Sequence, residues 1–166
     1  MEVYEWPIQI EVNIEVGVGE TVVRYFATDF FMERERYLRG EVADASIWMV
    51  GYGLRVNPYR DVKIKVDREE MPFKEVSLGN AEVLIPFEKG GVLDEYIVTG
   101  RVRGVERLPV LDEEIYMVRI SNIPLGELDI LVNKNNVKGE VKVGDMVEAV
   151  GWMEGKIPGG KWQTLK

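Results

Sequence analysis

The sequence contains neither cysteine nor histidine, and the two absences exclude much of ordinary enzyme chemistry. Without cysteine there are no disulfides, no thiolate nucleophile, and no zinc or iron–sulfur cluster held by thiolates. Without histidine there is no imidazole base, no Ser-His-Asp triad and no histidine-bound metal. The sequence also lacks the Gly-x-Gly-x-x-Gly, P-loop and EF-hand patterns. We therefore expect no catalytic cofactor.

Alanine and glutamine are scarce, with 5 and 2 residues among 166, whereas valine and isoleucine together number 37. β-branched side chains are stiff in helices and pack well on pleated strands, so this balance predicts an all-β protein. Few thermolabile residues beside abundant Glu, Lys and Arg are typical of thermophilic proteins.

No apolar run approaches the roughly 18 residues that a membrane helix needs. The first residues lack the basic and apolar regions of a signal peptide. The sequence therefore predicts a soluble cytoplasmic protein without membrane contact, and its net charge is −8.

The acidic charge lies mainly in the first part of the chain. Residues 1–94 carry a net charge of −7 and residues 95–166 a net charge of −1, and Gly90-Gly91 between them is a turn or linker signal. We therefore predict two domains, an antiparallel β domain over 1–90 and a second β domain with a C-terminal tail over 91–166.

The first ninety residues predict about six strands and one helix. Residues 8–18 alternate apolar and polar side chains without a break, the period of a half-buried strand, and this long strand is a candidate edge. A helix is expected over 28–40, and the Gly79-Asn80 pair predicts a hairpin between strands at 74–78 and 81–87. The remaining strands are expected at 21–27, 41–56 and 61–67. Such a series is typical of an antiparallel sandwich or barrel.

Residues 96–153 resemble an OB-fold, a small five-stranded Greek-key barrel. The resemblance lies in the long glycine-bearing strand Val98-Thr99-Gly100-Arg101-Val102-Arg103-Gly104-Val105 and in the Gly144-Asp145 turn into an apolar strand. Many members insert a helix between their third and fourth strands, where this chain offers only Lys134-Asn135-Asn136. The resemblance implies a binding surface for single strands or oligosaccharides on the outer face of the first three strands.

Alternation places arginines on that outer face. Arg101, Arg103, Arg107 and Arg119, with Asn133 and Lys134 nearby, would form a basic patch of the kind that single-stranded nucleic acid requires. The competing interpretation, which the thermophilic composition favours, is that these arginines form cross-strand ion pairs with Glu106, Glu114 and Asp129. We expect a non-enzymatic binding or assembly protein whose partner is single-stranded nucleic acid or another protein.

Two other functions remain open. Asp29, Glu33 and Asp44 could supply the carboxylates of a hydrolase or of an oxygen-ligand metal site, neither of which needs histidine. Such a site requires these carboxylates to converge in one concave pocket. A long edge strand could instead pair across a symmetry axis in a structural homo-oligomer.

Overall fold

The computed structural model of this protein describes residues 3–5, 12–18, 21–40, 45–65, 75–86 and 94–157. Most of these residues lie in strands, and the single α-helix is short. The all-β fold class is therefore confirmed.

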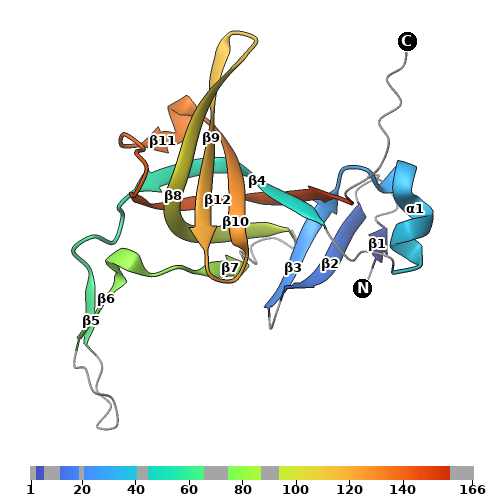
Figure 1. Ribbon diagram of the computed structural model, residues 1–166, viewed down its shortest axis with the longest axis horizontal. Coiled ribbons are helices and arrows are strands. Elements are labelled where there is room, and N and C mark those ends of the chain that lie inside the picture. The colour runs from blue at the N-terminus through green and yellow to red at the C-terminus, as the bar shows by residue number, and fades with distance from the viewer. Residues whose placement is uncertain are drawn as a thin grey trace.

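Five strands close into a barrel, which is the centre of the molecule (Figure 1). They are β4 (Ser46–Val56), β8 (Glu95–Val110), β9 (Glu113–Asn122), β10 (Gly126–Asn133) and β12 (Met146–Lys156). β9 lies between β8 and β10, and β12 pairs with β8. β4 closes the remaining gap, because it is parallel to β10 and antiparallel to β12.

The 16-residue strand β8 pairs with two neighbouring strands along its length. Its residues 95–101 pair with β12 and its residues 101–110 with β9, so the strand must bend between them. Gly100 lies at this bend, where a Cβ atom would stand only 2.4 Å from the carbonyl oxygen of Ser121. The close approach of the two backbones explains why glycine occupies the position.

The barrel interior is filled by side chains that alternate along its strands, as the sequence pattern predicts. The fully buried residues include Met49, Leu54, Val98, Val102, Val118, Ile120, Ile130, Ala149 and Met153. All five strands contribute to this one cluster, so β4 shares its core with the C-terminal half of the chain.

The residue range expected for the barrel is therefore corrected. The range 96–153 supplies β8, β9, β10 and β12, but the remaining strand, β4, comes from residues 46–56. An apolar strand can pair with any complementary edge, and alternation along the chain does not say which edge it will find. The predicted boundary at Gly90-Gly91 lies outside the described residues.

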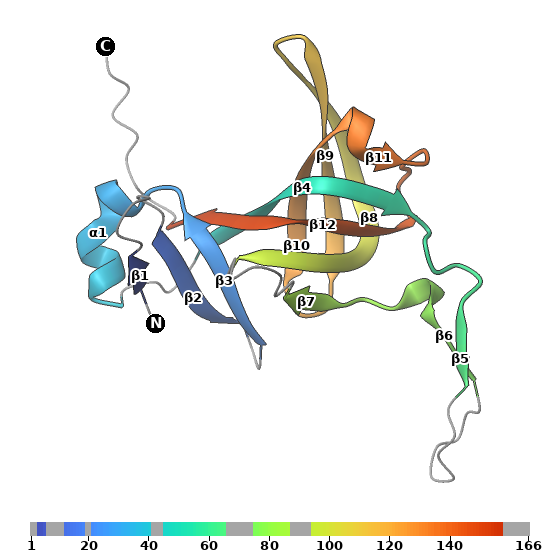
Figure 2. The ribbon, with the colours of Figure 1, turned by 180° about the vertical axis from the view of Figure 1, so that it is seen from behind.

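A three-stranded ribbon and a helix extend from one end of the barrel (Figure 2). The ribbon comprises β1 (Val3–Glu5), β2 (Val12–Val18) and β3 (Thr21–Ala27), and the helix α1 spans Phe30–Leu38, within the predicted range. β3 joins the barrel through a short parallel pairing with β12. β2 pairs with β1 on one side and β3 on the other, so it is not the edge strand that the sequence suggested.

The chain between β4 and β8 contains β5 (Lys63–Lys65), β6 (Glu75–Ser77), the 3₁₀ turn η1 (Leu78–Asn80) and β7 (Leu84–Pro86). The hairpin predicted at Gly79-Asn80 is wrong, because β6 pairs with β5 and β7 pairs with β8. A second 3₁₀ turn, η2 (Lys134–Asn136), and the short strand β11 (Val137–Lys138) connect β10 to β12. This is the place where many OB-folds insert a helix and where the sequence offers only Lys134-Asn135-Asn136.

Candidate binding site

The register of β8 against β9 decides where the predicted arginines lie. Arg101 is opposite Ser121, and Gly104 is opposite Arg119, so the extra residue Arg103 forms a bulge. The Nε of Arg103 donates to the hydroxyl oxygen of Ser121 at 3.1 Å. Arg103 and Arg119 therefore lie beside Ser121 on the outer face of the barrel.

Arg119 is neutralised on that face. Its Nε and Nη2 donate to the two carboxylate oxygens of Asp129 on β10, at 2.7 and 3.0 Å. These hydrogen bonds and the neighbouring charges of Glu127 and Glu106 raise the pKa of Arg119. Because acidic groups surround this arginine, the centre of the outer face offers little attraction to a phosphate.

Arg107 and Lys134 gather at a different place, around Glu114. Arg107 Nε is 3.6 Å and Lys134 Nζ 2.7 Å from the Glu114 carboxylate, whose pKa is lowered chiefly by the lysine hydrogen bond. The Arg107 guanidinium also lies 5.5 Å from the ring centroid of Tyr116, which is its cross-strand partner. Asn133 donates to Glu113 at 2.8 Å. The ion-pair interpretation is therefore observed for Glu114 and Asp129.

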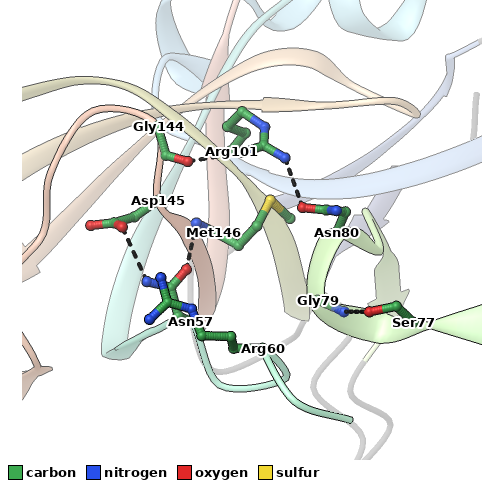
Figure 3. Close-up of a pocket in the computed structure, with 9 residues that line it drawn as sticks. All are labelled: Asn57, Arg60, Ser77, Gly79, Asn80, Arg101, Gly144, Asp145 and Met146. Carbon is green, nitrogen blue, oxygen red and sulfur yellow. Dashed lines mark hydrogen bonds between the residues drawn. The ribbon is translucent and has the colours of Figure 1, made fainter. Parts of the chain in front are cut away.

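A cavity of about 270 Å³ opens beside the remaining arginine, Arg101 (Figure 3). Four chain segments line it: the turn after β4, the η1 turn, the middle of β8, and the start of β12 with the turn before it. The lining residues are Asn57, Arg60, Ser77, Gly79, Asn80, Arg101, Gly144, Asp145 and Met146.

One wall of the cavity is built around Asn57, which ends β4 with a positive φ of 48°. Its side-chain amide donates to Asp145 at 3.0 Å, and its Oδ1 accepts from the backbone N–H of Met146 at 3.1 Å. The second Asp145 oxygen accepts from the backbone N–H of Lys142 at 3.0 Å. Gly144, with a φ of 96°, makes the turn that this arrangement requires. The wall is thus fixed by bonds that use both Asp145 oxygens.

The opposite wall is the η1 turn, held in place against β8. Ser77 caps the turn by accepting from the backbone N–H of Gly79 at 3.3 Å. After the turn, the Thr99 hydroxyl donates to the carbonyl oxygen of Ala81 at 2.6 Å and accepts from the N–H of Val83 at 2.8 Å. Thr99, which precedes Arg101 by two residues on β8, is consequently buried under this segment.

Arg101 joins the two walls. One guanidinium nitrogen donates to the carbonyl oxygen of Gly144 and another to the Oδ1 of Asn80, each at 2.9 Å. Both acceptors are neutral, so Arg101 keeps its full charge. Arg60 also lines the cavity, and no ion pair or side-chain hydrogen bond of Arg60 occurs within the described ranges. The cavity therefore has two guanidinium groups and one carboxylate.

Asp29 and Glu33, the two candidate carboxylates that the structure describes, bond to different partners. Asp29 is buried and accepts from the Tyr37 hydroxyl at 2.6 Å and from the backbone N–H of Ile157 at 3.0 Å. Glu33 instead accepts from Arg36 at 3.1 Å, and Asp44 lies outside the described residues. Within the part of the chain that the structure describes, no three Asp or Glu side chains gather in a metal-binding cluster.

Sequence analysis missed most of the cavity residues and the buried carboxylate next to them. Glu148 on β12 is only 5% exposed and bonds to Arg55, whose Nε lies 2.9 Å away, and to the Tyr59 hydroxyl. The signal that could have located the cavity was the presence of polar residues at three turns, Asn57-Pro58, Gly79-Asn80 and Gly144-Asp145. These three turns are far apart in the sequence, and only the folded structure brings them together around one cavity.

No helix among the described residues has the length and apolar stretch needed to cross a membrane. Comparison of this chain with models of protein families, with curated proteins and with solved structures found no match.

Proposed function

We propose that the protein is a non-enzymatic binding protein that holds single-stranded nucleic acid along β8, with Arg101 and Arg103 contacting the phosphates. One observation carries this proposal. Arg101 and Arg103 bond only to neutral oxygen atoms within the described ranges, whereas Arg107, Arg119 and Lys134 bond to carboxylates. Guanidinium groups with uncompensated charge are the ones available to a phosphate backbone.

The barrel supports the proposal through its likeness to an OB-fold. That fold has five strands, and the three that follow one another as β8, β9 and β10 correspond to the segments whose sequence resembles it. Here one strand, β4, precedes the strand that resembles the first. The closed five-stranded barrel is compatible with an OB-like barrel whose strands follow a different order along the chain, and OB-fold barrels bind single strands on their outer surface.

The net charge of −8 limits how such a ligand can bind. At physiological salt, interactions between charges more than about 8 Å apart are largely screened. Only phosphates in direct contact with an arginine therefore gain attraction. With two phosphate contacts on a single strand, the logarithm of the binding constant should fall with the logarithm of salt concentration at a slope of about −1.4. Binding should therefore be of modest affinity and salt-sensitive.

The test is fluorescence anisotropy of a labelled oligothymidylate of about 12 nucleotides, titrated between about 50 and 200 mM salt. The double variant Arg101→Ala with Arg103→Ala should remove most of the salt dependence. Arg34→Ala on α1 removes the same charge from an exposed site outside the barrel and should leave it unchanged. Thermal melting establishes that each variant is folded. Absence of salt-sensitive binding at micromolar protein would overturn the proposal and leave a protein partner.

A further inference from the structure

The cavity beside Arg101 is small and polar. Ligand pockets for drug-sized molecules hold roughly 300–1,000 Å³ and are mostly apolar, whereas this one holds about 270 Å³. Among the described residues, Met146 is the only large apolar side chain that lines it, and no aromatic ring does so. It therefore lacks the surface on which a base would stack, and its lining suits a compact charged group.

The hydrogen-bonding groups that remain available in the cavity are mainly donors. Arg60 has five N–H donors and no partner for its guanidinium within the described ranges. Asn80 uses its Oδ1 to accept from Arg101, which leaves its amide NH₂ for a ligand. Each oxygen of Asp145 already accepts one hydrogen bond, from Asn57 and from a backbone N–H respectively. These free donors match a ligand that is rich in hydrogen-bond acceptors.

Two of the three donor groups, those of Arg101 and Asn80, are also held in position before any ligand arrives. The two hydrogen bonds of Arg101 fix its planar guanidinium between the η1 turn and the turn at Gly144 (Figure 3). The same bond to Asn80 fixes the orientation of that amide. Donors that are already oriented lose little conformational entropy on binding, which increases affinity for a ligand of matching geometry.

We propose that this cavity is a binding site for a phosphomonoester, held by Arg60, Arg101 and the amide of Asn80. A phosphomonoester carries a charge of about −1.5 to −2 and three strong acceptor oxygens, which three groups of donors can share. The inference rests on the proposed function where the phosphate is the phosphorylated end of a strand lying on β8. A free nucleoside monophosphate presents the same group and is the other source of this chemistry.

The volume of the cavity favours the end of a strand over its interior. An internal phosphodiester has chain on both sides and only two free oxygens, so it must pass over a surface. A cavity of about 270 Å³ between two walls has the volume for a terminal phosphate with its sugar. Arg101 belongs to both the cavity and β8, so a strand whose end is bound here would continue toward Arg103.

The experiment compares labelled oligothymidylates that carry a 5′-phosphate, a 3′-phosphate or hydroxyl groups at both ends. We expect one phosphorylated strand to bind at least about tenfold more tightly than the hydroxyl strand, the factor that one charge-assisted hydrogen bond supplies. Arg60→Ala should abolish this preference and leave the hydroxyl strand within about twofold of its original affinity, because the hydrogen bonds that position Arg101 and Arg103 go to other residues than Arg60. Arg34→Ala, the matched control on α1, should preserve the preference. Unlabelled thymidine monophosphate should compete with the phosphorylated strand.

The outcomes separate this inference from the proposed function. Equal binding of all three strands, unaffected by Arg60→Ala, would overturn the phosphomonoester site and leave the single-strand proposal intact. If no strand binds but thymidine monophosphate does, and Arg60→Ala removes that binding, the site stands and the strand proposal fails. Absence of binding by every strand and by the nucleotide would overturn both.

Discussion

Replacement of Asp29 by asparagine tests whether this carboxylate supports the fold or is available for chemistry. Asp29 is 5% exposed, and its two oxygens accept hydrogen bonds from the Tyr37 hydroxyl and the backbone N–H of Ile157. Asparagine has the same shape but only one acceptor oxygen, so one of the two bonds must be lost. A buried hydrogen bond to a charged group contributes about 1.5–3 kcal/mol. We therefore expect Asp29→Asn to lower the free energy of unfolding by that amount.

The assay is urea unfolding followed by tryptophan fluorescence, with thermal melting in parallel. For a protein of this length, the expected loss corresponds to a decrease in Tm of about 3–12 °C, with the urea m-value unchanged. Glu35→Gln is the matched control, because that side chain is 73% exposed and pairs with Arg39 at 3.9 Å, so its loss should cost less than about 0.5 kcal/mol. An Asp29 variant as stable as this control would refute the structural role and return Asp29 and Glu33 to consideration as an acid–base pair.

Two further predictions concern Gly100 in the barrel and three buried tyrosines of the chain. Gly100→Ala should destabilise the protein by about 1–3 kcal/mol in urea unfolding, because the new Cβ would lie 2.4 Å from a carbonyl oxygen of β9. Gly53→Ala, whose Cβ would meet its nearest atom at 3.8 Å, is the control, and equal effects would contradict the close approach. Burial raises the pKa of Tyr25 to about 12 and shifts Tyr37 and Tyr96 in the same direction. Above about pH 10 the unfolded chain loses tyrosine protons that the folded chain retains, so stability should fall as the pH rises. Tyrosinate absorbance measured together with urea unfolding checks this, and titration near pH 10 without loss of stability would be the contrary result.

The strands of the barrel were predictable because their signal is local. Inward and outward side chains alternate along β8, β9, β10 and β12, and glycines mark the bend and the turn before β12. The helix over Phe30–Leu38 was predictable for the same reason. The position of β4 was not, because its pairing with β10 and β12 joins residues about 80 to 110 positions apart in the sequence.

The basic patch illustrates how one residue changes a prediction based on alternation. Without the bulge at Arg103, positions 101, 103 and 107 would all face outward. The extra residue reverses the alternation after it, so Val105 lies opposite the buried Val118 and Arg107 lies opposite Tyr116, with the Arg107 side chain still 70% exposed. The cavity was equally inaccessible to sequence reasoning, because its lining comes from turns whose convergence depends on the closed barrel.

In an acidic protein, the partner of each arginine matters more than the number of arginines. A guanidinium bonded to a carboxylate, as in Arg119 with Asp129, presents almost no net charge to a ligand. One bonded to a carbonyl, amide or hydroxyl oxygen is positioned by that bond and keeps its charge, as Arg101 and Arg103 do. The negative charge of the rest of the chain weakens the nonspecific attraction of distant anions. An anion is then attracted only within about one Debye length of such an arginine. An anion that binds this protein must therefore contact such an arginine directly, and the cavity beside Arg101 brings two guanidinium groups to one place for a compact anion.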